Sequence, residues 1–298
     1  MKPVAVIVAY FLAVVFAGAV LAPWLYGSGQ WVAARGVMPF LAETEFQKFF
    51  NRAALVAAVA LLWPTVRALR IGGWQELGLE RDARWARHLG VGFVLATLLV
   101  ALLAATYIGL EVYRWKKVLA WTRLPGLLLS AFAVAVVEEA LFRGALLGVF
   151  RRAMRPLTAL FWVTAIFAIV HFLKPDDRIV IEQVTWASGF ALLPHIFHQF
   201  TQPVEVLAGF TTLFVLGSVL GFATLWTRSL WLAIGFHAGV VFVKMSFSKF
   251  TKREAEYLPW IGEKLEIGLV PVAVLASGGV LIWVWLRYVD RSIRPASE

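Results

Sequence analysis

The sequence predicts an all-α fold, a polytopic bundle of about eight transmembrane helices. Hydrophobic residues fill 61% of its 298 positions, charged residues fill only 15%, and the mean hydropathy is +0.78. Soluble globular chains of this length are far less apolar. Mostly apolar stretches of about 20 residues, long enough to cross a hydrocarbon core, recur along the chain. Because backbone groups in lipid must be satisfied within each segment, these unbroken runs indicate helices rather than alternating strands.

Eight segments have the character of a membrane span. The second and fifth are short, so the expected range is seven to nine spans. The predicted spans are Val4–Tyr26, Ala53–Leu69, Leu89–Leu110, Gly126–Phe150, Leu157–Leu173, Val204–Trp226, Leu230–Phe247 and Gly268–Leu286. The longest polar connections, Gly27–Arg52 and Lys174–Pro203, are too short for a soluble domain. A third connection, Gly72–His88, mixes tryptophans with charges and is typical of an interfacial helix or turn, although an ordinary connector fits equally well.

Charge and cysteine content exclude several classes of function. The formal net charge is +10, but the basic residues are scattered over short loops and form no continuous basic face. The lipid bilayer, and not nucleic acid, is therefore the partner that the charge indicates. The chain has no cysteine, which excludes a disulfide framework, a thiol nucleophile and a thiolate metal site.

Three charged residues stand in the stretch "EEALFR" inside the fourth predicted span. A charge near the bilayer centre costs at least about 2.5–3.5 kcal/mol, so these side chains need partners or a wet cavity. Glu139 and Arg143 are four residues apart, which stacks them on one helical face in the better order for an ion pair. Glu138 lies about 100° further round the helix. It is left outside that pair, and burial would give it the raised pKa of a general base.

Two histidines lie in later spans. His171 follows Phe167 by four residues in "FAIVHF", near the end of the fifth span, and His237 stands near the middle of the seventh, in "LWLAIGFHAGVVF". Either histidine alone could be a hydrogen-bonded structural residue. Together with Glu138 they form a trio on three helices. Such a trio could hold a metal ion, or it could activate water with one carboxylate and one histidine while the second histidine stabilises negative charge.

The order of these motifs resembles the CPBP family, which contains the type II CAAX prenyl endopeptidases and the bacterial Abi-type intramembrane proteases. The resemblance rests on E-E-x-x-x-R (Glu138, Glu139 and Arg143), on F-x-x-x-H (Phe167 and His171) and on the element around His237. It covers about residues 126–247. The implied division is an N-terminal part, 1–125, with spans and an interfacial segment, a protease core, 126–247, and a C-terminal span and tail, 248–298.

The resemblance implies a glutamic-type intramembrane endopeptidase without a cofactor. Glu138 and His171 would activate water, and His237 would stabilise the oxyanion, with Glu139, Arg143 and Phe167 in support. The family has an asparagine four residues after this histidine, whereas this chain has Val241. The implied substrate is a membrane-anchored or C-terminally processed protein, and the implied location is the bacterial cytoplasmic membrane.

Three other interpretations stay open. The first is a zinc-dependent intramembrane protease, with Glu138, His171 and His237 as ligands. His195 and His198 also have a spacing that could suggest a metal site, but the segment around them favours a reentrant or interfacial helix involved in substrate access. The second is a transporter, for which paired broken helices or repeat symmetry would be expected and are not evident. The third is a non-catalytic membrane scaffold.

Overall fold

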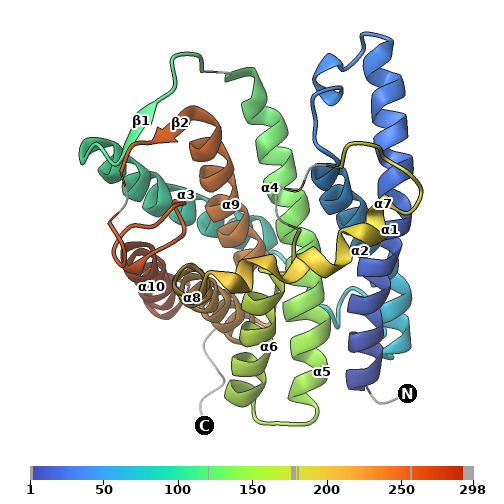
Figure 1. The fold of residues 1–298 in the computed structure, drawn as a ribbon. Coiled ribbons are helices and arrows are strands. Elements are labelled where there is room, and N and C mark those ends of the chain that lie inside the picture. Colours follow the sequence, from blue (N-terminus) through green and yellow to red (C-terminus); the bar gives the residue numbers. More distant parts are fainter. Residues whose placement is uncertain (1–2, 120, 176–178, 180, 256, 291–298) are drawn as a thin grey trace. The chain divides into compact units, whose positions relative to one another are not determined.

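The computed structural model describes residues 3–119, 121–175, 179, 181–255 and 257–290 (Figure 1). The structure is 74% helical, with nearly no strands, which confirms the predicted all-α polytopic bundle. Seven of the described helices are long and apolar enough to cross a membrane. The chain divides into two compact units, of which unit 1 comprises Met1–Ile71 and Val170–Pro203, and unit 2 comprises Gly72–Ile169 and Val204–Glu298.

Unit 1 is built on two long helices. They are α1 (Pro3–Ala34) and α2 (Phe46–Ala68), joined by a connection with one 3-10 turn at Pro39–Leu41. Gly18 permits a close approach here, because a Cβ atom at this position would lie 3.0 Å from the backbone of Ala54. The later segment of the unit forms α7 (Ser188–Ala191), which packs on α1, and a 3-10 helix at Leu193–Thr201.

Unit 2 contains the remaining helices and one small sheet. Its elements are α3 (Trp85–Gly109), β1 (Tyr113–Trp115), a 3-10 turn (Trp121–Arg123), α4 (Leu124–Glu139), a π-helical segment (Ala140–Leu146), α5 (Leu147–Arg151), α6 (Pro156–Val170), α8 (Pro203–Thr227), α9 (Trp231–Phe250), β2 (Thr251–Arg253), α10 (Leu269–Val284) and a second π-helical segment (Trp285–Val289). Strands β1 and β2 pair antiparallel with Arg114 opposite Lys252, which ties the chain after α3 to the end of α9 (Figure 1).

Helix α9 lies at the centre of unit 2. Its apolar stretch is 61% buried, against 22–44% for the other six candidate spans. Its main neighbours are α3 and α4. Glycine makes the α3 contact possible, because a Cβ atom at Gly235 would collide with the backbone of Leu89, and one at Gly239 would lie 2.7 Å from the backbone oxygen of Phe93. Small residues of this kind let two membrane helices approach closely.

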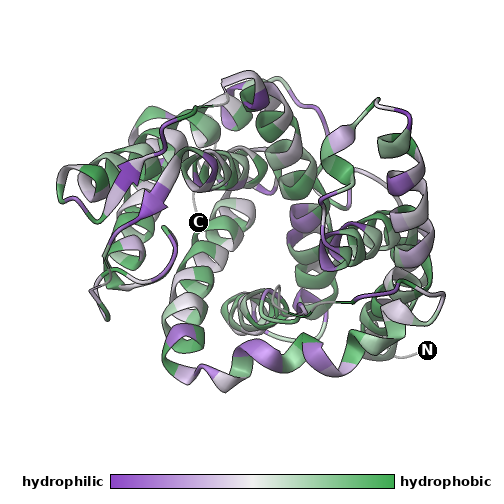
Figure 2. Cartoon of the chain, turned by 45° about the horizontal axis from the view of Figure 1, so that its top comes forward, coloured by the Kyte–Doolittle hydropathy of each residue, from purple (hydrophilic) through white to green (hydrophobic). Residues whose placement is uncertain are grey.

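The outer surfaces of the spans are apolar. Large side chains such as Leu98, Leu102, Leu129 and Leu157 are more than 60% exposed in the isolated chain. Hydrophobic residues predominate along the helices in Figure 2, and hydrophilic residues gather in the connections and on the two strands. Exposed apolar surface on this scale fits contact with lipid, and the described chain is thus built to span a membrane.

Three sequence predictions need correction. The fifth predicted span corresponds to α6, which has only 15 residues and ends at Val170, so His171 lies in a turn beyond the helix. The connection predicted at Gly27–Arg52 is shorter, because α1 and α2 extend into it through apolar and aromatic residues. The segment predicted as a reentrant or interfacial helix, Lys174–Pro203, contains only α7 and a 3-10 helix in its described part. The division of the chain at 125/126 and 247/248 stays a prediction.

The close crossing of α3 and α9 can be tested with two glycines of α3. A Cβ atom at Gly92 would lie 2.7 Å from the backbone nitrogen of Phe236 and would also collide with the backbone oxygen of Leu232, whereas one at Gly90 meets nothing within 4 Å. We expect Gly92→Ala to lower the free energy of unfolding by about 1–3 kcal/mol, as overpacking does. Gly90→Ala should be neutral or stabilising, because alanine is the better helix former. Thermal unfolding in detergent measures both, and equal stability of the two variants would contradict this packing.

Candidate active site

The site begins at the end of α4, where the helix changes its hydrogen-bonding pattern. Pro125 stands in the first turn of α4, a position that suits its fixed backbone angle. The apolar helix ends at Glu139 and continues directly as the π-helical segment Ala140–Leu146. Such π-helical segments are rare and occur frequently at functional sites. Both glutamates of the motif therefore lie at the junction, and Arg143 lies within the wider turn.

Glu139 and Arg143 form the expected ion pair. Nη1 of Arg143 donates to Oε1 of Glu139 over 2.8 Å, and the two side chains are 1% and 0% exposed. A second guanidinium nitrogen, Nη2, donates to the backbone oxygen of Gly217 on α8 over 3.2 Å. This second bond satisfies part of the donor capacity of the buried guanidinium group. Arg143 thus links the end of α4 to the middle of α8.

Phe167 of α6 packs against this pair. Its ring centroid lies 4.3 Å from the guanidinium carbon of Arg143, which is a cation–π contact, and its ring meets Phe142 edge to face at 5.1 Å. Gly217 makes room for the group, because a Cβ atom there would lie 3.1 Å from Phe167 and 3.2 Å from Nη2 of Arg143. Phe167 thus packs against the ion pair, and its supporting role in the reaction stays a prediction.

His237 enters the cluster from α9. Its Nδ1 atom lies 2.8 Å from Oε1 of Glu139, and its side chain is 3% exposed. Because Oε1 of Glu139 already accepts a hydrogen bond from Arg143, the proton of its hydrogen bond with His237 is assigned to Nδ1, an assignment inferred from the partners. The glycines that contact α3 lie two residues before and two after His237, on the opposite face of α9. The crossing with α3 therefore directs His237 towards α4.

Glu138 is not as isolated as the sequence indicates. Its Oε2 atom lies 3.8 Å from Nε2 of His237, and its side chain is 23% exposed. The two nitrogens of His237 therefore face two neighbouring glutamates. From sequence spacing, Glu139 was expected to contact only Arg143, and Glu138 was expected to lie outside that ion pair. The contacts of both glutamates with His237 were missed because the approach of α9 is a long-range contact, which the local helical pattern does not contain.

His171 and Val241 are the other two predicted positions. His171 lies at the start of the Val170–Pro203 segment of unit 1, just after the end of α6, and its convergence with Glu138 and His237 stays a prediction. Val241 lies one turn after His237 on α9 and is partly buried. Its side chain has no hydrogen-bonding group, so it cannot supply the second donor that the family's asparagine would provide.

Sequence reasoning missed the glycines that bring the cluster together. Gly217 and Gly221 on α8, and Gly235 and Gly239 on α9, are each four residues apart. This small-xxx-small spacing is the usual signature of close helix contacts in membranes. The pattern could have identified α8 and α9 as tightly packed helices, but not their partners.

The side chains of the cluster also determine whether it could bind a metal ion. Within the part of the chain that the structure describes, no group of three or more histidine, aspartate or glutamate side chains could hold a metal ion. Glu139 already interacts with Arg143 and His237. In this cluster of unit 2, the possible metal ligands are then Glu138 and one nitrogen of His237. His195 and His198 lie in the 3-10 helix of unit 1. The predicted absence of a cofactor stays a prediction.

Fold and site together describe a polytopic membrane protein with an ionisable cluster between its helices, which is a candidate functional site. Residues 119–243 match the family described as Rce1-like, type II CAAX prenyl endopeptidase Rce1-like. The match covers less than half of the chain and supports the family that the motifs indicate, and with it a protease at the level of the family. The chain is an integral membrane protein. A search of curated proteins found no match.

The shared hydrogen bonds of Glu139 predict a different outcome for each glutamate. Glu139→Gln removes the charge that holds Arg143 and His237, and breaking a buried pair in this way costs about 3–5 kcal/mol. We expect a clear fall in the unfolding temperature in detergent. Glu138→Gln, the same change at the adjacent residue, should leave that temperature near the wild-type value. Equal unfolding temperatures for both variants would contradict the structural role of Glu139.

Proposed function

We propose that the chain is a glutamic-type intramembrane endopeptidase that hydrolyses a peptide bond of a membrane-associated protein. The observation that carries the proposal is the placement of Glu138 beside Nε2 of a histidine whose Nδ1 is held by Glu139. In hydrolysis, such a carboxylate can act as the general base, while the oriented imidazole donates a hydrogen bond to the oxyanion. The family match supports this reaction class.

In this proposal Glu138 is the general base. Its carboxylate takes a proton from a water molecule as the water oxygen attacks the carbonyl carbon of the substrate. His171, placed in this role by the family resemblance, orients the same water. When the tetrahedral intermediate collapses, the C–N bond breaks and Glu138 returns the proton to the leaving amine nitrogen. Glu138 is thus regenerated in each cycle.

His237 stabilises the oxyanion in this proposal through Nε2–H. Since Nδ1–H donates to Glu139, donation from Nε2 as well requires a doubly protonated ring. The two glutamates that face its nitrogens supply the negative charge that such a cation needs. Val241 adds no second donor, so a donor from elsewhere or the imidazolium charge itself replaces the amide of the family.

We further propose that the reaction uses no metal ion. Arg143 and His237 compete with any metal for Glu139, and an imidazolium ring cannot be a metal ligand. The substrate that fits the resemblance is a membrane-anchored or C-terminally processed protein, and the membrane that fits best is the bacterial cytoplasmic membrane. A transporter could also carry a glutamate and a histidine at membrane depth, but it would be expected to show paired broken helices or repeat symmetry.

The proposal predicts that Glu138→Gln abolishes cleavage. The probe is a quenched fluorescent peptide with a lipid anchor, incubated with the purified full-length protein in detergent containing EDTA. We expect the rate to fall on the order of 10²–10⁴-fold, the usual contribution of a general base. Glu111→Gln, at an exposed residue with a side chain 76% accessible, is the matched control and should cleave normally. Wild-type cleavage by Glu138→Gln, or loss of wild-type cleavage in EDTA, would contradict the mechanism.

A further inference from the structure

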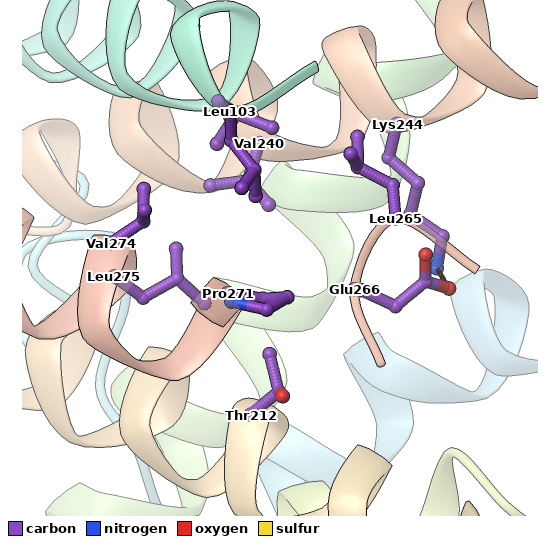
Figure 3. A pocket seen from close by; sticks show the side chains of 10 residues that line it. Leu103, Thr212, Val240, Lys244, Leu265, Glu266, Pro271, Val274 and Leu275 are labelled. Carbon is purple, nitrogen blue, oxygen red and sulfur yellow. Dashed lines mark ion pairs between the residues drawn. The ribbon is translucent and has the colours of Figure 1, made fainter. Parts of the chain in front are cut away.

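A narrow pocket and a wider groove both border α10 in unit 2, and they differ in the molecule that could enter them. The narrow pocket ends at Lys244 of α9, whose Nζ atom lies 2.7 Å from a carboxylate oxygen of Glu266 (Figure 3). Its volume is about 20 Å³, which is room for about one water molecule. The groove lies between α8 and α10 and has a volume of about 370 Å³. That volume is in the range of ligand clefts in proteins, about 300–1,000 Å³.

The groove is mostly apolar and opens on the outer surface of two adjacent spans, α8 and α10 (Figure 1). Its lining includes Val219 and Phe222 of α8 and Gly279, Val280 and Trp283 of α10. The two helices touch where Val219 meets Gly279, because a Cβ atom at this glycine would lie 2.8 Å from the valine side chain. The main helix partner of α10 is α3, so α8 and α10 leave space between them beside this contact. An apolar groove on the outside of a span faces the acyl chains of the bilayer.

The groove leads to the end of the unit at which both helices finish. Positions on α8 and α10 advance together, from Thr212 with Leu275 in the narrow pocket to Phe222 with Trp283 in the groove. The two helices are therefore parallel. Their common end also carries the start of α3, where Trp85 packs on Trp231 at the start of α9, with ring centroids 5.2 Å apart.

Arg287 lies at this end of the groove, one turn beyond Trp283. Its guanidinium carbon is 5.8 Å from the ring centroid of Trp283 and 6.0 Å from that of Tyr288, so two cation–π contacts hold an exposed charge beside the groove. No carboxylate in the described part of the chain is within ion-pair distance of Arg287, whereas Arg87 at the same end lies 3.6 Å from Asp290. Tryptophan and tyrosine are enriched at headgroup depth, and arginine side chains extend towards it.

An apolar groove that ends at an exposed arginine has the two parts needed to bind a phospholipid. An acyl chain fits the groove, and a guanidinium group can donate two hydrogen bonds to a phosphate. Arg228, exposed just after the end of α8, adds a second positive charge at the same end. Each basic residue near the membrane surface favours an anionic lipid by about fivefold. The charge therefore selects a headgroup with a net negative charge.

We propose that the groove between α8 and α10 binds one anionic phospholipid, with an acyl chain against Val280 and Trp283 and the headgroup at Arg287. The bound chain fills the space between the two helices and holds α10 against α8. The groove shares no lining residue with the cluster of Glu138 and His237. The inference is thus independent of the proposed function, and it concerns a lipid that is bound and not cleaved.

Native mass spectrometry of the full-length protein in detergent tests the inference, because it counts the lipids that each protein molecule retains. The probes are phosphatidylglycerol and phosphatidylcholine with identical acyl chains. We expect the wild-type protein to retain one lipid and to prefer phosphatidylglycerol by about 5–10-fold. Arg287→Gln should reduce this preference to about twofold or less. Arg67→Gln, at an exposed arginine that lies over Trp63 of α2 in the same way, should keep it and is the matched control.

Val280→Trp separates binding in the groove from a general attraction of anionic lipid. Val280 is 59% exposed, so a larger side chain there fills the groove without entering the core, and retention of both lipids should fall on the order of tenfold. Leu281→Trp, at the next exposed residue and outside the groove lining, should retain lipid as the wild-type protein does.

Three results would overturn the inference. The first is equal retention of the two lipids by the wild-type protein. The second is an unchanged preference in Arg287→Gln or unchanged retention in Val280→Trp. The third is a wild-type dimer that Val280→Trp converts into a monomer, which would make the groove an interface between two copies of the chain.

Discussion

The carboxylate of Glu139 joins two helices of unit 2 through hydrogen bonds to one of its oxygens. Arg143 donates to this oxygen from the π-helical segment after α4, and His237 approaches it from α9. Arg143 also reaches the backbone of α8 and packs over Phe167 of α6. An uncompensated charge in this position would be strongly unfavourable, so the four helices must keep their relative positions. Glu138 is placed beside His237 by the same arrangement, since it is the preceding residue on α4.

Close helix packing makes this polar cluster possible. Gly217 lets Arg143 and Phe167 approach the backbone of α8, while Gly235 and Gly239 let α3 press against the opposite face of α9. Backbone contact on one side of α9 thus fixes the rotation of the helix, and with it the direction of His237 on the other side. The cluster is the polar counterpart of an otherwise apolar core, which also surrounds the pocket at Lys244.

The membrane spans and one ion pair of the site could be predicted from local patterns in the sequence. Apolar run lengths indicated the spans, and the four-residue spacing of Glu139 and Arg143 indicated their ion pair, because both features repeat along a single helix. The contact of Glu139 with His237 and the pairing of Lys244 with Glu266 join residues that are 98 and 22 positions apart. Neither contact has a local signature, since each depends on how helices pack.

Two local features were also missed. The residues of the π-helical segment are ordinary helix formers, so the sequence does not distinguish it from an α-helix. Helix α6 ends earlier than predicted, which leaves His171 outside the predicted span.

The hydrogen bond between Glu139 and His237 is open to direct measurement. Ring ¹⁵N resonances report which nitrogen of a histidine carries a proton, and a His237→Gln sample identifies the signals among the five histidines of the chain. We expect Nδ1 of His237 to carry a proton in the wild-type protein, because it donates to the carboxylate oxygen that also accepts from Arg143. A neutral ring with its only proton on Nε2 would contradict this expectation, because Glu139 would then accept no hydrogen bond from His237. The contact that orients His237 beside Glu138 would be lost.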